Sequence, residues 1–143
     1  MEKKKRERRA DAALFALYLL GLLLLLFWRE KRGEPGFNLM PLRSVKVYCR
    51  ILFTPGWSEE LRRYAWINFL GNLLLFVPLG LFLPRLFPPL RRFSLFAAAV
   101  CAFLIIIEAL QFLTARGSLD IDDLILNLLG TCTGFALRRG RRE

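Results

Sequence analysis

The stretch from residue 108 to residue 127 combines carboxylate, amide and guanidinium side chains, which can move protons or bind a polar or anionic group. Glu108 and Gln111 are three positions apart and share a helix face, and Asp123 and Asn127, four apart, share another. A solvated turn accounts for the polar residues between the pairs, but not for a carboxylate and an amide inside the hydrophobic run before it. We therefore interpret this stretch as the functional site. The residues between the pairs are Arg116, Asp120 and Asp122.

The composition is that of a membrane protein. Hydrophobic residues make up 55% of the 143 residues, and the mean hydropathy is +0.39, which is wrong for a soluble domain. The net charge of +10 could suggest a nucleic-acid partner, but most of the basic residues flank apolar runs. They indicate topology-setting charge at a membrane surface instead, and we expect no nucleic-acid binding.

The sequence contains no histidine, which removes the commonest general base and metal ligand. Its three cysteines, Cys49, Cys101 and Cys132, show no metal-ligand spacing. We therefore expect no metal site, no redox centre and no cofactor, and we assign no catalytic residue.

The hydrophobic pattern predicts an all-α fold, a bundle of about four transmembrane helices. A basic N-terminus (residues 1–11) precedes a membrane domain (12–137) and a basic tail (138–143). The spans are predicted over residues 12–28, 65–87, 93–113 and 119–137. A shorter apolar patch, residues 45–53, cannot cross a membrane; an interfacial or re-entrant segment and an ordinary surface helix remain open for it.

Two features of these spans bear on helix packing. In the second span, Asn68 and Asn72 lie on one face, and amides in lipid usually bond across helices. Pro78, Gly80 and Pro84 should kink the far end of that span. In the fourth span, the small-residue spacing permits close helix approach, either within one chain or in a homo-oligomer. The residues with this spacing are Gly130 and Gly134.

The distribution of Lys and Arg predicts the orientation. Thirteen lie in the N-terminus, the 85–92 turn and the tail, against nine on the other side, spread over a longer stretch. By density, both termini are expected to be cytoplasmic. Three helices then place amides and carboxylates in one layer of the outer leaflet. Such a layer is either a network that locks the helices together or a pocket for a polar headgroup, with Arg116 as the partner for Glu108, Asp120 or Asp123.

At these residues the chain resembles the VanZ-like family. The matching segments are NLMPL (38–42), NFLGNLLLFVPLGLFLP (68–84), the E-x-x-Q pair with Arg116, and DIDDLILNLLG (120–130) followed by Gly134. They occur in the family's order and cover residues 12–137. The sequence departs from the family at Leu42, usually an aromatic, and at Arg116-Gly117, where the order is usually reversed.

The resemblance implies a small multi-pass protein of the bacterial plasma membrane and cell envelope, associated in some members with resistance to teicoplanin-type lipoglycopeptide antibiotics. We expect it to bind membrane lipids or lipid-linked envelope precursors in an extracytoplasmic polar pocket, without catalysis. The family's polar positions correspond to Asn38, Asn68, Asn72, Glu108, Gln111, Arg116, Asp120, Asp123 and Asn127.

Two alternatives belong to other functional classes. An intramembrane enzyme would use Glu108 or Asp123 as general base and Arg116 to steady an anionic intermediate, but no nucleophile motif or metal cluster supports it. A small proton-coupled transporter would use Glu108 as a relay, but no ionisable residue continues the path through the cytoplasmic half of the spans.

Overall fold

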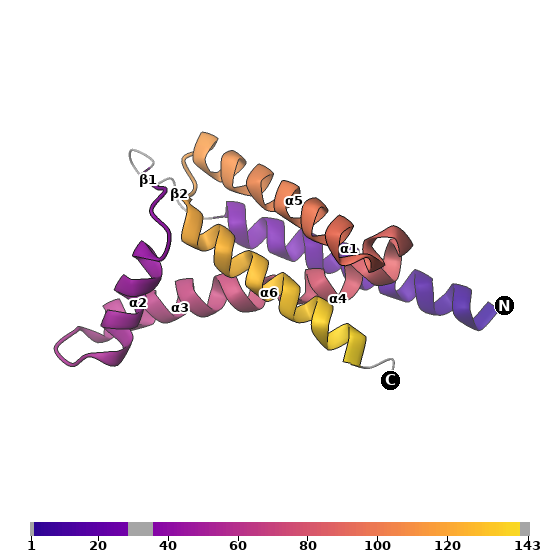
Figure 1. Cartoon of the computed structure of the whole chain (residues 1–143), viewed down its shortest axis with the longest axis horizontal. Helices are drawn as coiled ribbons and strands as arrows, with labels where there is room; N and C mark the ends of the chain where they lie inside the picture. The colour runs from indigo at the N-terminus through magenta and orange to yellow at the C-terminus, as the bar shows by residue number, and fades with distance from the viewer. Residues whose placement is uncertain (1, 29–35, 141–143) are drawn as a thin grey trace.

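The computed structural model, drawn in Figure 1, describes residues 2–28 and 36–140 and confirms the all-α fold. The only strands in these residues are two segments of two residues each. Residues 29–35 of the first loop and 141–143 of the predicted tail lie outside the described residues, as does Met1. The elements are α1 (Glu2–Phe27), β1 (Phe37–Asn38), α2 (Arg43–Phe53), α3 (Glu59–Leu75), α4 (Val77–Leu86), the short 3₁₀ helix η1 (Pro88–Arg91), α5 (Phe93–Leu113), β2 (Leu119–Asp120) and α6 (Ile121–Gly140).

Three stretches of the described helices are long and apolar enough to cross a membrane: Lys5–Phe27, Glu59–Leu86 and Phe93–Leu113. Many of their large apolar side chains are exposed on the protein surface, as Leu17 and Ile106 are, which suits contact with lipid tails. Helix α6 does not meet the same criteria, because charged residues near both of its ends shorten its apolar stretch. The membrane-compatible fold is thus established, and the fourth span over 119–137 stays a prediction.

The bundle has four long helical segments, which are α1, α3 continued by α4, α5, and α6. They lie side by side and alternate in direction (Figure 1). The first turns of α1 and the last turns of α6 lie at the same end of the bundle, and the β1–β2 pairing lies at the opposite end. This arrangement suits a chain that crosses a membrane an even number of times. The cytoplasmic location of the two termini stays a prediction.

The second predicted span is interrupted at Phe76, between α3 and α4. Pro78 cannot donate a backbone hydrogen bond and lies in the first turn of α4, where that loss is tolerated. The Tyr18 hydroxyl of α1 donates to the Leu75 carbonyl at 2.7 Å, so a backbone oxygen beside the interruption is bonded by a neighbouring helix. Phe76 is fully buried in the main core with Phe96, so packing holds the interruption in place.

Helix α6 packs on α3 and α4 at backbone contact. A Cβ atom added at Gly130 would lie 1.9 Å from the Leu73 carbonyl oxygen, and one at Gly134 would lie 2.0 Å from that of Val77. Conversely, a Cβ at Gly80 of α4 would lie 1.9 Å from a backbone oxygen of α6. The glycine spacing is therefore used within one chain. Residues of α3 and α4 cover Gly130 and Gly134 within the chain, and a homo-oligomer stays a prediction.

The apolar patch at 45–53 belongs to α2, a helix of 11 residues. One face of α2 buries Tyr48, Ile51 and Leu52 against α3, where Ala65 is fully buried and Phe69 completes the contact. Figure 1 shows α2 lying across the end of α3, at the same end of the bundle as β1 and β2. This small second core holds α2 to the bundle.

Replacing Gly130 with alanine should force α6 away from α3, since the new methyl carbon would lie 1.9 Å from the Leu73 carbonyl oxygen. We expect the free energy of unfolding to fall by about 1–3 kcal/mol, the usual range for overpacking, in a denaturant titration of the detergent-solubilised protein. Gly71→Ala is the matched control, because a Cβ there has no atom within 4 Å, and it should leave stability unchanged or slightly raised. Equal losses in the two variants would contradict the backbone contact.

Candidate functional site

The Asp122 side chain is fully buried and caps a helix distant in sequence. Its two carboxylate oxygens accept hydrogen bonds from the backbone amides of Leu42 (2.5 Å), Ser44 (2.6 Å) and Val45 (3.3 Å). These are amides at the start of α2, which have no partner within the helix. Leu42, at the N-cap position, supplies no side-chain acceptor and has a φ of 63°. The missing cap therefore comes from α6, where a carboxylate also suits the positive end of the α2 dipole.

Asp120 joins β1, α2 and α6 at the same place. Its carboxylate accepts from Asn38 Nδ2 at 3.0 Å, from Ser44 Oγ at 2.6 Å and from the Asp122 backbone amide at 2.9 Å. The pairing of β1 with β2 is parallel and sets Asn38 opposite Asp120. Asn38 Oδ1 in turn accepts from the backbone amide of Met40 at 3.2 Å. Asn38 and Asp120, both predicted site residues, thus meet in a network that fastens the first loop to α6.

Asp123 points to a different helix from its neighbour Asp122. Asn72 Nδ2 of α3 donates to Asp123 Oδ1, which links α3 to α6 across the bundle. An interhelical bond of this kind is the ordinary use of an amide inside a membrane protein. Asn68, one turn earlier on α3, donates to the Tyr64 carbonyl of its own helix at 2.7 Å.

Gln111 and Arg116 both contact the last turn of α1. Gln111 Nε2 donates to the Leu26 carbonyl at 3.1 Å, and the Arg116 guanidinium donates to the Phe27 carbonyl. The chain turns back after α5 because Ala115 adopts a φ of 53° and the Arg116 amide bonds to the Gln111 carbonyl at 2.9 Å. The Arg116 side chain therefore points toward α1. Its acceptor there, the Phe27 carbonyl, was not suggested by the position of Arg116 in the sequence.

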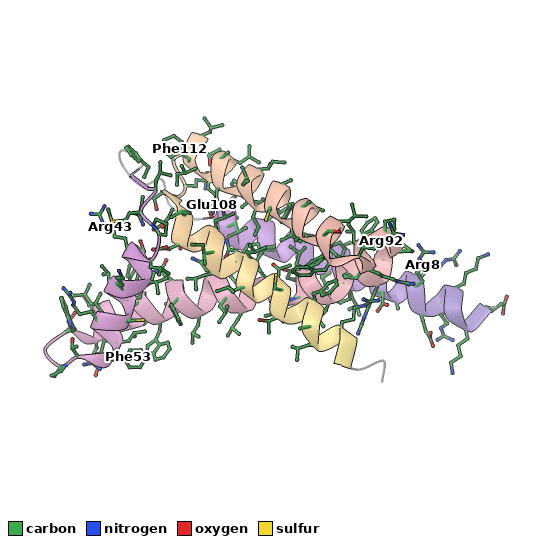
Figure 2. All side chains as sticks on the ribbon, in the orientation of Figure 1. Arg8, Arg43, Phe53, Arg92, Glu108 and Phe112 are labelled. Atoms are coloured by element: carbon green, nitrogen blue, oxygen red, sulfur yellow. The ribbon has the colours of Figure 1, made fainter. Side chains whose placement is uncertain are left out.

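Glu108 lies at the wall of a small cleft. Its side chain is 6% exposed, and Figure 2 shows it on α5 beside the first turn of α6. The cleft has a volume of about 210 Å³, and Glu108 and Asp120 are its two polar lining residues. The apolar lining residues are Leu39, Ile105, Ala109, Leu119, Ile121 and Leu124.

Asn127, the last of the predicted residues, lies deeper in α6 and is 3% exposed. Its Oδ1 atom is buried and has no hydrogen-bond partner among the described residues. Its backbone carbonyl accepts from the Thr131 hydroxyl at 2.7 Å. The structure does not place Asn127 in the cleft lined by Glu108.

A larger and more open groove follows one face of α1 and ends at Arg116. It has a volume of about 670 Å³, within the range of sites that hold small molecules. Its walls are apolar apart from the guanidinium. The lining residues are Leu20, Leu23, Leu24, Phe27, Trp28 and Arg116.

Asp122 and Ser44 belong to this hydrogen-bond network, but the sequence-based set of site residues omits them. A signal for Asp122 exists, because α2 begins after Pro41 and Leu42, neither of which can cap a helix with its side chain. Its amides need an acceptor from elsewhere, and an acidic segment such as residues 120–123 is the natural source. Among the described residues, no group of three His, Cys, Asp or Glu side chains is placed to hold a metal ion.

This architecture defines a class: a small all-α membrane protein in which buried acidic and amide side chains tie the first loop and a short helix to the membrane-compatible helices. The model of the VanZ/LLP1 family matches residues 13–139, and the chain belongs to that family. The resemblance read from the sequence is thereby confirmed, and the protein is a VanZ-like protein, of a family associated with antibiotic resistance. No curated protein and no solved structure matches the chain.

Replacing Asp122 with alanine should leave the first amides of α2 without their acceptor. We expect hydrogen exchange at residues 42–45 to accelerate by about tenfold or more, since losing the acceptor of a buried amide costs roughly 1–3 kcal/mol. Asp123→Ala is the matched control, because the Asp123 carboxylate accepts from Asn72 instead. Unchanged protection at 42–45 in the Asp122 variant, measured by mass spectrometry on the solubilised protein, would contradict the cap.

Proposed function

We propose that this VanZ-like protein binds an anionic amphiphile, either a membrane lipid or a lipid-linked envelope precursor, in the groove along α1. The observation that supports this most directly is the composition of the groove, five apolar side chains that lead to one guanidinium. An acyl chain would lie against Leu20, Leu24 and Phe27, and a phosphate or carboxylate would contact Arg116. If α1 crosses the membrane, the groove lies on a surface that the membrane covers.

Arg116 is suited to this contact. A guanidinium carries five N–H donors in a planar fork and can bind a phosphate or carboxylate through two of them. Its bond to the Phe27 carbonyl sets the guanidinium at the mouth of the groove. A side chain pre-positioned in this way loses less conformational entropy when a ligand binds.

The other predicted site residues do not line this groove. Asn38 and Asp120 fasten the loop together with Asp122; Asn72 and Asp123 join α3 to α6, and Gln111 holds α5 to α1. The cleft beside Glu108, about 210 Å³, is smaller than the usual range for ligand sites. The negative charge of its two carboxylates would also repel a phosphate.

In this proposal the site faces the extracytoplasmic side of a bacterial plasma membrane, where envelope precursors and lipid-bearing antibiotics meet the bilayer. Occupying or reorganising lipids at that surface would limit how a lipoglycopeptide of the teicoplanin type anchors itself. A drug that lacks the lipid tail should be affected less. The orientation and the resistance phenotype of this protein are both part of the proposal.

The Arg116→Ala variant should abolish protection against teicoplanin in a Gram-positive host, at membrane levels matched to the wild type, with a smaller effect on vancomycin susceptibility. Arg63→Ala, which removes an exposed arginine of α3, is the control and should protect like the wild type. A second variant, Leu24→Trp, should also reduce protection, because it fills the groove and keeps Arg116. Full protection by a well-expressed Arg116→Ala protein would refute the proposed role of the guanidinium.

A further inference from the structure

The exposed aromatic residues mark a membrane boundary at the α2 end of the bundle. All three tryptophans of the chain lie toward this end: Trp28 follows α1, Trp57 precedes α3 and Trp66 lies in the first half of α3. Each is at least 41% exposed, and Tyr64 is exposed beside them. Tryptophan and tyrosine gather where the hydrocarbon core meets the headgroups, so this level of the bundle is an interface.

Helix α2 lies at that level or beyond it. The combined stretch Glu59–Leu86 has 28 residues, about 42 Å at the helical rise, whereas a hydrocarbon core is about 30 Å thick. The first turns of α3 therefore stand in the headgroup region. Helix α2 packs through Tyr48, Ile51 and Leu52 on α3 near Ala65 and runs crosswise to α3 (Figure 1). If α3 crosses the membrane, α2 lies along the membrane surface rather than across it.

The face of α2 opposite its buried residues carries a basic stripe, which consists of Arg43, Lys46 and Arg50. Their spacing of three and four residues places them on one side of the helix, and all three are exposed. No described carboxylate forms an ion pair with any of them. Figure 2 shows Arg43 pointing away from the bundle.

The stripe is held on a fixed support. Asp122 caps the first turn of α2, and the contact of Tyr48 and Ile51 with α3 holds the rest. At the end of α2, Trp57 Nε1 donates to Thr54 Oγ1 at 3.0 Å, which places an indole beside the helix terminus. Because these contacts fix α2 on the bundle, the face that carries the three cationic residues has a defined direction.

We propose that α2 is an interfacial helix whose basic stripe binds the phosphate groups of anionic phospholipids at this end of the bundle. Charge complementarity carries the assignment, since three cationic side chains at a headgroup level face outward without a carboxylate from the described chain. This site is separate from the groove at Arg116 and does not depend on the function proposed there.

The test uses the full chain with Trp28→Phe and Trp66→Phe, so that Trp57 is the single tryptophan and can be excited selectively. The protein is reconstituted in vesicles of phosphatidylcholine and phosphatidylglycerol, with bromine on the acyl chains of one lipid or the other. Comparing the quenching of Trp57 by the two brominated lipids then shows which lipid is enriched at the sites beside it. We expect a preference for phosphatidylglycerol of about threefold or more, which should disappear between about 10 mM and about 1 M NaCl as the Debye length falls from about 30 Å to about 3 Å.

Arg43→Gln, Lys46→Gln and Arg50→Gln together should reduce the preference to about one. The matched control removes one lysine and two arginines from the opposite end, with Lys5→Gln, Arg6→Gln and Arg9→Gln, and should keep the preference. Arg116→Ala should also keep it, which separates this site from the proposed lipid groove. The proposal is overturned if the protein that carries only the two tryptophan substitutions shows a preference ratio near one, or a ratio that salt does not change. This outcome counts even if the triple variant fails to fold.

Discussion

The bonds from the Asp122 carboxylate to the first amides of α2 are the interaction on which one end of this molecule depends. Backbone donors that are shielded from water must find an acceptor within the protein. The residues that lead into α2 cannot provide one, and α6 provides it instead. These bonds fix the start of α2, and the neighbouring Asp120 fixes β1, because Ser44 and Asn38 both bond to its carboxylate.

Farther along the bundle, close packing of apolar and small residues adds to these polar contacts. Lipid tails are as apolar as leucine, so helices in a membrane gain stability from close packing rather than from excluding water. Gly80, Gly130 and Gly134 allow α6 to touch the α3–α4 backbone, and Phe76 and Phe96 fill the adjoining core. The polar ties at one end and the glycine contacts farther along α6 therefore act on the same pair of elements, α6 and α3–α4.

Much of the fold could be predicted from the sequence. The remainder depends on the directions of individual side chains, which the spacing of residues does not give. Hydrophobic runs indicated the long helices, and α5 occupies the residues predicted for the third span, 93–113. Spacing also singled out the polar residues, but not their partners. Asp122 and Asp123 are adjacent, yet one faces α2 and the other α3, because successive helical residues point about 100° apart. The path of Arg116 depends on a positive φ at Ala115, a conformation that alanine gives no reason to expect.

The cap on α2 also sets an order of events during synthesis. Leu42 and Asp122 are 80 residues apart, so the first turn of α2 leaves the ribosome about 4–16 s before its acceptor, at the usual rates of elongation. Helices α3, α4 and α5 are made in that interval. Helix α6, which emerges after them, thus closes the first loop. A chain that stops before Asp122 would hold the three membrane-compatible stretches of the described residues and still present an open helix end, which distinguishes it from a chain that includes α6.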